Sequence, residues 1–239
     1  MGVVYQNYLT IDGRSTLDFN TWISGGGTYG SPVRDVSSVS VPGRNGDIII
    51  DNGRFQNVSL QYESFISKDF DENMRALRAF LSSLRGYKRL EDTYHPEEYR
   101  LALFSAGLEP KTTTLNRAGS FTLTFNCKPQ RFLRSGELPV TFSTTGAKIL
   151  NETLYEAEPV IRAFGTGTVT IGDVSVQVTT ADGYTDIDSR IQEAYKGTTN
   201  CNANIVLTNG VFPTIKPGLN DVNFTGFSSI QITPNWWTL

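Results

Sequence analysis

From residue 159 to its end, the chain is a series of short segments in which apolar and polar residues alternate, and this limits the fold more than any other feature. Alternation puts apolar side chains on one face of a strand and polar ones on the other. Glycines fall between the segments, where turns need conformations that other residues avoid. Short strands at this spacing predict an antiparallel β-sandwich. The expected strands cover residues 159–164, 168–171, 174–178, 184–188, 203–207, 222–224 and 229–237.

The first half of the chain also has β character. In residues 36–66, turn-forming residues at 42–46 and 51–53 separate three apolar segments. The middle segment contains the run Ile48–Ile50, which is typical of a buried strand. We predict a meander of three strands here, with this run in the core. Two further strands are expected at residues 99–104 and 120–127.

One α-helix is predicted, from about residue 69 to residue 85. Phe70, Met74, Leu77, Leu81 and Leu84 share one face at 3.6 residues per turn, so the helix should pack that face against a sheet. At its start, Asp69 and Glu72 have the spacing of a capping box. At its end, Arg85 complements the helix dipole and Gly86 suits the C′ position.

A break in the regular pattern divides the chain. Residues 128–138 contain proline, glycine and charged residues, and we place the domain boundary after residue 134. Residues 1–134 carry 16 Lys and Arg against 14 Asp and Glu, whereas residues 135–239 carry 5 against 10. This difference in charge supports two domains with different surroundings. The fold class expected is mainly β, with a β-sandwich-like N-terminal domain containing the helix and a galectin-like C-terminal sandwich.

Several classes of protein are disfavoured by composition. No apolar stretch approaches the roughly 20 residues that span a bilayer, and no basic start precedes an apolar run, so we expect synthesis in a cytoplasm and no membrane contact. Cys127 and Cys201 lie far apart and lack the spacing of redox or zinc sites, which predicts two free buried thiols. The small basic excess of the first half does not support specific nucleic-acid binding.

Candidate chemical sites are few. Residues 25–30 fit a dinucleotide-binding glycine pattern, but no helix is expected after them, so we interpret them as a flexible loop. His95 is the only histidine and has no nucleophile elbow nearby, so no catalytic residue is predicted. An enzyme would have to use His95 or Asp186, and this stays the third hypothesis.

Two acidic segments are candidate cation sites. The first contains Asp92, Glu97 and Glu98, and we interpret it as a hydrated turn. The second, Asp182 with Asp186 and Asp188, lacks the EF-hand frame and is interpreted as a β-turn. We therefore predict no metal and no cofactor.

Two tryptophans near the end of the chain point to a different function. Trp236 and Trp237 offer aromatic faces on which sugar rings stack, and neighbouring strand residues point to opposite faces. We expect one of them in the core and the other facing solvent, a glycan or another protein. A carbohydrate-binding β-sandwich module is therefore the alternative function.

The order of several segments resembles one family, the distal tail (Dit) proteins of siphophages. These segments are residues 41–46 with the apolar strand after them, residues 91–102, residues 125–129, residues 151–167, residues 186–189, residues 216–220 and the final strand 229–237. The resemblance covers nearly the whole chain. Each segment alone is weak, and their order and spacing carry the similarity.

The resemblance implies a structural protein and not an enzyme. It implies a homohexameric ring at the distal end of the phage tail, in the tail tip or baseplate of the virion. The implied partners are the tail tube protein, a tail-tip or tail-associated protein and a receptor-binding protein. An exposed hairpin turn is the candidate contact between subunits, because unpaired edges and charges can bind a neighbour. Its residues are Pro42, Gly43, Arg44, Asn45, Gly46 and Arg54.

Overall fold

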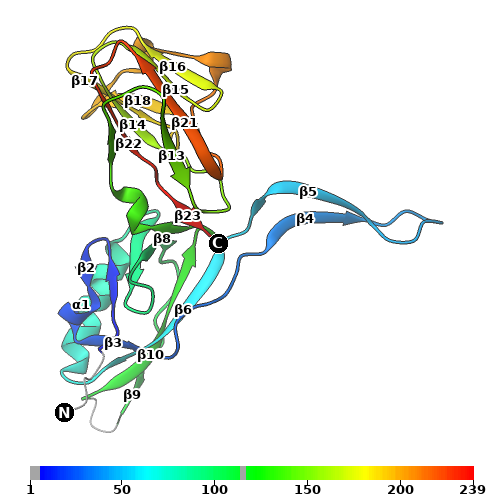
Figure 1. The fold of residues 1–239 in the computed structure, drawn as a ribbon. Helices are drawn as coiled ribbons and strands as arrows, with labels where there is room; N and C mark the ends of the chain where they lie inside the picture. Colours follow the sequence, from blue (N-terminus) through cyan, green and yellow to red (C-terminus); the bar gives the residue numbers. More distant parts are fainter. Residues whose placement is uncertain (1–5, 114–116) are drawn as a thin grey trace. The chain divides into compact units, whose positions relative to one another are not determined.

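The structure, a computed structural model, describes residues 6–113 and 117–239. The chain divides into two compact units: the first runs to Arg131 and includes Leu239, and the second runs from Phe132 to Thr238. Strands dominate both units, and the described residues contain one α-helix (Figure 1). The predicted mainly β fold class is therefore confirmed.

The first unit is built on a sheet with the strand order β2-β1-β7-β8-β10-β6-β3, with β9 paired to β10. These strands are β1 (Leu9–Ile11), β2 (Arg14–Ser15), β3 (Thr21–Ser24), β6 (Val58–Ile66), β7 (Lys88–Asp92), β8 (Glu98–Leu103), β9 (Lys111–Thr112) and β10 (Gly119–Cys127). A 3₁₀ turn, η1 (Thr16–Phe19), lies between β2 and β3. The strands β6 and β10 pair from Val58 opposite Cys127 to Ile66 opposite Gly119, so their alternating apolar residues share one face.

Helix α1 (Phe70–Ser83) packs on this core face. Its buried residues are Phe70, Met74, Leu77 and Leu81, which join the same cluster as Leu60, Phe121 and Leu123 of the sheet. The predicted amphipathic helix is confirmed because the apolar stripe at helical spacing finds a sheet to cover.

The predicted capping box is wrong. Asp69 has a left-handed backbone (φ 51°, ψ 47°), and its side chain caps no helix N–H. A capping side chain needs an extended backbone at that position. Here the Asp69 carbonyl instead accepts hydrogen bonds from Asn73 N (3.1 Å) and Asn73 Nδ2 (3.0 Å). At the other end, Arg85 donates to the Ser82 carbonyl at 2.9 Å as expected, but the C-cap is Leu84, so Gly86 lies one residue beyond C′.

The predicted three-strand meander is also wrong. Within residues 6–113 and 117–239, strands β4 (Arg34–Val39) and β5 (Ile48–Phe55) pair only with each other, while β6 pairs with β3 and β10. Figure 1 shows β4 and β5 as a two-stranded ribbon. The run Ile48–Ile50 is exposed and lies outside the core. An apolar run indicates that a strand packs against other apolar groups. The sequence alone does not distinguish packing in the core of the same chain from packing against another protein.

The second unit is a β-sandwich of two sheets. The first has the order β12-β22-β14-β17-β18-β19, with bounds β12 (Val140–Phe142), β14 (Val160–Phe164), β17 (Tyr184–Asp188), β18 (Glu193–Lys196), β19 (Thr199–Asn200) and β22 (Ile230–Thr233). The second has the order β13-β21-β15-β16-β20, with bounds β13 (Ala147–Asn151), β15 (Gly167–Ile171), β16 (Val174–Val178), β20 (Ile205–Leu207) and β21 (Gly218–Thr225). One core joins Ile161, Ile187 and Ile232 of the first sheet to Val169 and Val222 of the second.

The 3₁₀ turns of this unit are η3 (Arg134–Glu137), η4 (Asn202–Asn204) and η5 (Thr208–Gly210). Strand β11 (Arg131–Leu133), which begins at the last residue of the first unit, pairs with β23 (Trp237–Thr238). The single final strand predicted over 229–237 is wrong. Strand β22 ends at Thr233 because Pro234 lacks an N–H and Asn235 is left-handed (φ 56°).

Both cysteines are free and buried, as predicted. Burial raises the pKa of the Cys127 thiol to about 12. Within the described residues, no helix is both long and apolar enough to cross a membrane.

Candidate functional site

The hairpin β4–β5 places apolar side chains on both of its faces. Val39 lies opposite Ile48, Ser38 opposite Ile49, and Ser37 opposite Ile50, so consecutive isoleucines point to alternate faces. The exposed fractions of Ile48, Ile49 and Ile50 are 40%, 58% and 50%. We call the exposed residues Val36, Val39, Ile48, Ile49 and Ile50 the hairpin apolar surface.

Two ion pairs hold the base of this hairpin together across its strands. Arg34 Nε lies 2.6 Å from Asp51 Oδ2, and Arg54 Nε lies 2.6 Å from Asp35 Oδ2. The hydrogen bond from Arg54 is the main reason that the pKa of Asp35 is lowered. For Asp51, the pKa is lowered first by the Gly53 N–H, which donates to Oδ1 at 2.8 Å, and then by Arg34. Arg54, a predicted subunit contact, thus has a partner within its own hairpin.

The other predicted contact residues, 42–46, form the exposed tip. The Arg44 N–H donates to the Val41 carbonyl at 3.1 Å, and Gly43 between them has a positive φ of 79°. Proline followed by such a glycine is typical of a type II turn. Among the described residues, no ion pair to the Arg44 side chain is found, so its charge faces outward. Whether these residues contact another subunit remains a prediction.

The hairpin combines exposed apolar residues with open strand edges. Two-stranded ribbons are marginally stable in water, and contiguous exposed apolar residues mark interaction surfaces. The strand edges of β4 and β5 that face away from each other also leave backbone groups unpaired by any sheet. The sequence contained a signal for this surface, three consecutive isoleucines beside turn residues, but we interpreted it as a core strand.

The two tryptophans are held by packing within the second unit. Trp236 packs against the core cluster, and Gly136 fits beneath it because a Cβ there would lie 2.2 Å from Trp236 N. Trp237 stacks on Tyr155 with centroids 4.4 Å apart, and its indole N–H donates to the Glu156 carbonyl at 2.9 Å. One face of Trp237 is therefore occupied, which leaves less aromatic surface for a sugar ring.

In the acidic segment near His95, Asp92 and Glu98 form hydrogen bonds or ion pairs within the protein. Asp92 accepts from Tyr62 Oη at 2.8 Å and from the His95 backbone N–H at 2.9 Å, and it lies 3.0 Å from His95 Nδ1. Glu98 pairs with Arg131 at 3.3 Å. Glu97 is exposed. These contacts fix the turn between β7 and β8.

In the second acidic segment, Asp182, Asp186 and Asp188 also form ion pairs or hydrogen bonds within the protein. Asp182 pairs with Lys196 at 2.8 Å, and Asp186 accepts two hydrogen bonds from Arg162 at 2.7 and 2.8 Å. Asp188 Oδ1 accepts the N–H groups of Arg190 (3.0 Å) and Ile191 (3.3 Å). In the part of the chain that the structure describes, no group of three or more His, Cys, Asp or Glu residues is arranged to hold a metal ion.

The glycine-rich segment 25–30 is a loop between β3 and β4. The carbonyls of Thr28 and Gly30 accept hydrogen bonds from Arg131 Nη2 at 3.1 and 3.4 Å. Expected as a flexible loop, it is thus anchored at two carbonyls. No helix follows it, so it lacks the context of a dinucleotide site.

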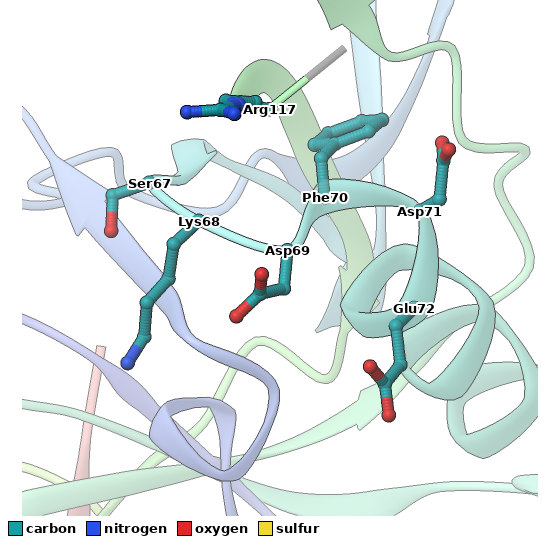
Figure 2. Close-up of a pocket in the computed structure, with 7 residues that line it drawn as sticks. All are labelled: Ser67, Lys68, Asp69, Phe70, Asp71, Glu72 and Arg117. Carbon is teal, nitrogen blue, oxygen red and sulfur yellow. The ribbon is translucent and has the colours of Figure 1, made fainter.

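A depression of about 610 Å³ lies at the N-terminus of α1. Its walls include Lys68, Asp69, Asp71, Glu72 and Arg117 (Figure 2). Figure 2 shows the carboxylate of Asp71 pointing up and those of Asp69 and Glu72 pointing down, so the three acidic groups do not all converge on one ligand position. We assign no function to this depression.

Comparisons with known proteins identify the fold. No protein-family model matches the chain, and no curated protein matches it. Among solved structures, the Dit protein of phage SPP1, described as a paradigm of the hub adsorption apparatus in phages that infect Gram-positive hosts, is similar with a TM-score of 0.79 and 13% identity. The match covers 98% of this chain and 100% of that chain.

A second structure agrees. The baseplate of phage p2 in its activated conformation contains a chain that is similar with a TM-score of 0.53 and 12% identity, covering 95% of this chain and 97% of that one. The chain therefore has the Dit fold over nearly its full length.

Proposed function

We propose that this protein is a structural subunit of a phage tail: a hub at the distal end of the tail tube, built as a closed ring of six copies. The observation that carries the proposal is the shared fold with the SPP1 hub protein, over 98% of this chain and 100% of that chain. Similarity confined to one domain would support only a shared module. Here the similarity extends over both units of this chain.

The hairpin β4–β5 would join neighbouring copies in this assembly. In a ring, each copy presents one surface to the next, and the contact closes without free ends when the rotation divides a full turn. A hairpin with uncovered apolar faces and open edges is a suitable donor for such a contact. Burial on a neighbouring copy would remove Ile48, Ile49 and Ile50 from water.

The remaining surfaces would serve docking. We assign to the ring the roles of joining the tail tube protein, a tail-tip or tail-associated protein and a receptor-binding protein in the virion. Asp92 and Asp186 accept structural hydrogen bonds from Tyr62 and Arg162, which favours a mechanical role over an enzymatic one.

The assembly role of the hairpin is tested by the variant Ile48→Thr/Ile49→Thr/Ile50→Thr. Threonine keeps the β-branched shape that strands favour and removes apolar surface. Each replacement should cost the contact about 1 kcal/mol, so association should weaken at least about 100-fold. Light scattering after gel filtration should give six times the chain mass of 26.4 kDa for the unaltered protein and a smaller mass for the variant.

The matched control is Leu154→Thr, because Leu154 is 85% exposed but lies in the second unit. It should leave the assembled mass unchanged. Both variants should keep the melting temperature of the unassembled chain, since none of these residues belongs to a core cluster. A triple variant that still forms rings of unchanged stability would remove the hairpin from the interface, while the fold-based proposal would survive.

A further inference from the structure

Arg100 is a buried cation whose two terminal nitrogens have no hydrogen-bond partner among the residues that the structure describes. It lies on β8 opposite Leu90, and the two-residue period of the strand puts it on the same face as the core residue Ala102. Its exposed fraction is 6%. In the described part of the chain, neither Nη1 nor Nη2 of Arg100 has a hydrogen-bond partner.

A second arginine lies at the same place. Arg131 is 9% exposed, and its Nη1 and Nη2 groups bond to Glu98 and to the carbonyls of Thr28 and Gly30. Its Nε has no partner among the described residues. Three guanidinium nitrogens on two buried side chains thus have unused donor capacity.

These groups border a small cavity. Its walls include Tyr62, Asp92, His95, Glu98, Arg100 and Arg131, and its free volume is about 10 Å³. This is room for one guest of roughly the size of a water molecule. Phosphate groups, nucleotides and sugars are too large.

The electrostatics favour a negative guest. Asp92 is bonded to Tyr62 and His95, and Glu98 is bonded to Arg131, so both carboxylates of the cavity already have donors. Burial, and next the charge of Arg131, lower the pKa of Arg100. A guanidinium does not lose its proton in proteins, and a buried charge without a partner is costly. A counter-ion bound beside Arg100 would therefore offset the free-energy cost of burying its charge.

We propose that this cavity binds one small monovalent anion of halide size, with Arg100 as the principal ligand and Arg131 Nε as a second donor. The anion would neutralise Arg100 and fix the turn between β7 and β8 through the side chains around it. The proposal concerns the first unit alone and does not depend on ring formation.

The direct test is diffraction from crystals of the full chain grown in sodium bromide, with data collected at the bromine absorption edge. The expected result is an anomalous peak within hydrogen-bond distance of Arg100 Nη1 or Nη2, absent in Arg100→Met. The control Arg78→Met removes an exposed arginine from the outer face of α1 and should keep the peak. A cavity holding only a water molecule, with no anomalous signal, would overturn the proposal.

Thermal unfolding gives an independent readout. At equal ionic strength, sodium chloride should raise the melting temperature by about 2–4 °C relative to sodium gluconate, whose anion does not fit the cavity. Arg100→Met should lose this difference and Arg78→Met should keep it. An equal difference in all three proteins would show a general salt effect and would contradict the site. If Arg100→Met does not fold, the bromide diffraction of the unaltered protein decides.

Discussion

At the scale of single residues, the core of the first unit depends on Gly119. Its backbone conformation does not require glycine, but the space around it does. Gly119 begins β10 with no positive φ, but a Cβ there would lie 2.4 Å from Cε2 of Phe70, the first residue of α1. Phe70 is 4% exposed and belongs to the core cluster of the first unit. The glycine thus lets the start of the helix lie directly on the strand.

We predict that Gly119→Ala lowers the free energy of unfolding by about 1–3 kcal/mol, because the added methyl overpacks a filled core. Gly107→Ala is the matched control, since a Cβ at Gly107 meets no atom within 4 Å and its φ is not positive. That change should stay within about 0.5 kcal/mol of the unaltered protein. Urea unfolding followed by tryptophan fluorescence measures both. Equal stabilities of the two variants would show that Phe70 moves freely.

Arg100 shows the limit of sequence reasoning at this scale. The alternation in residues 98–103 places Arg100 on the face of Ala102. The sequence does not show that the terminal nitrogens of Arg100 lack partners. The groups that surround these nitrogens come from β6, β7 and the segment after β10, which are distant in sequence. Long-range juxtaposition of this kind requires the fold.

At the scale of elements, the local sequence pattern predicted correctly whether a segment forms a helix or a strand when that depends on the segment alone. Helix α1 follows from its apolar stripe, and β16 and β17 match the predicted segments 174–178 and 184–188. The predictions that were wrong concerned what an element packs against. The run Ile48–Ile50 has the composition of a buried strand but lies on an uncovered hairpin. Pro234 and Asn235 interrupt the predicted final strand. The apolar and polar alternation on both sides of these residues led us to predict one continuous strand.

The hairpin should loosen in acid before the core does. The pKa of Asp51 in the folded protein lies below its ordinary value of 3.8, chiefly because the Gly53 N–H donates to it. The stabilisation from this contact is therefore complete above pH 3.8 and is lost as the pH falls through the lower folded pKa. The NMR shift of the Gly53 amide should titrate with a midpoint below 3.8, and Asp51→Asn should abolish that titration. A midpoint at or above 3.8 would mean that this contact does not form in solution.

At the scale of the whole molecule, the sequence carried the fold class because many short alternating segments leave few alternatives to packed β-sheets. Resemblance in the order of segments led to the Dit fold, which the structural similarity to the SPP1 protein supports at only 13% identity. The proposed subunit contact was less accessible to sequence reasoning. It depends on which apolar residues the folded chain leaves uncovered, and the fold shows that β4 and β5 pair with no other described strand.

The central claim is that copies of this chain close into a ring and do not act singly. Negative-stain electron microscopy of the purified protein tests it most directly. We predict class averages of closed rings with sixfold symmetry, formed without any other tail component. A uniform field of separate single copies at high protein concentration would contradict the claim.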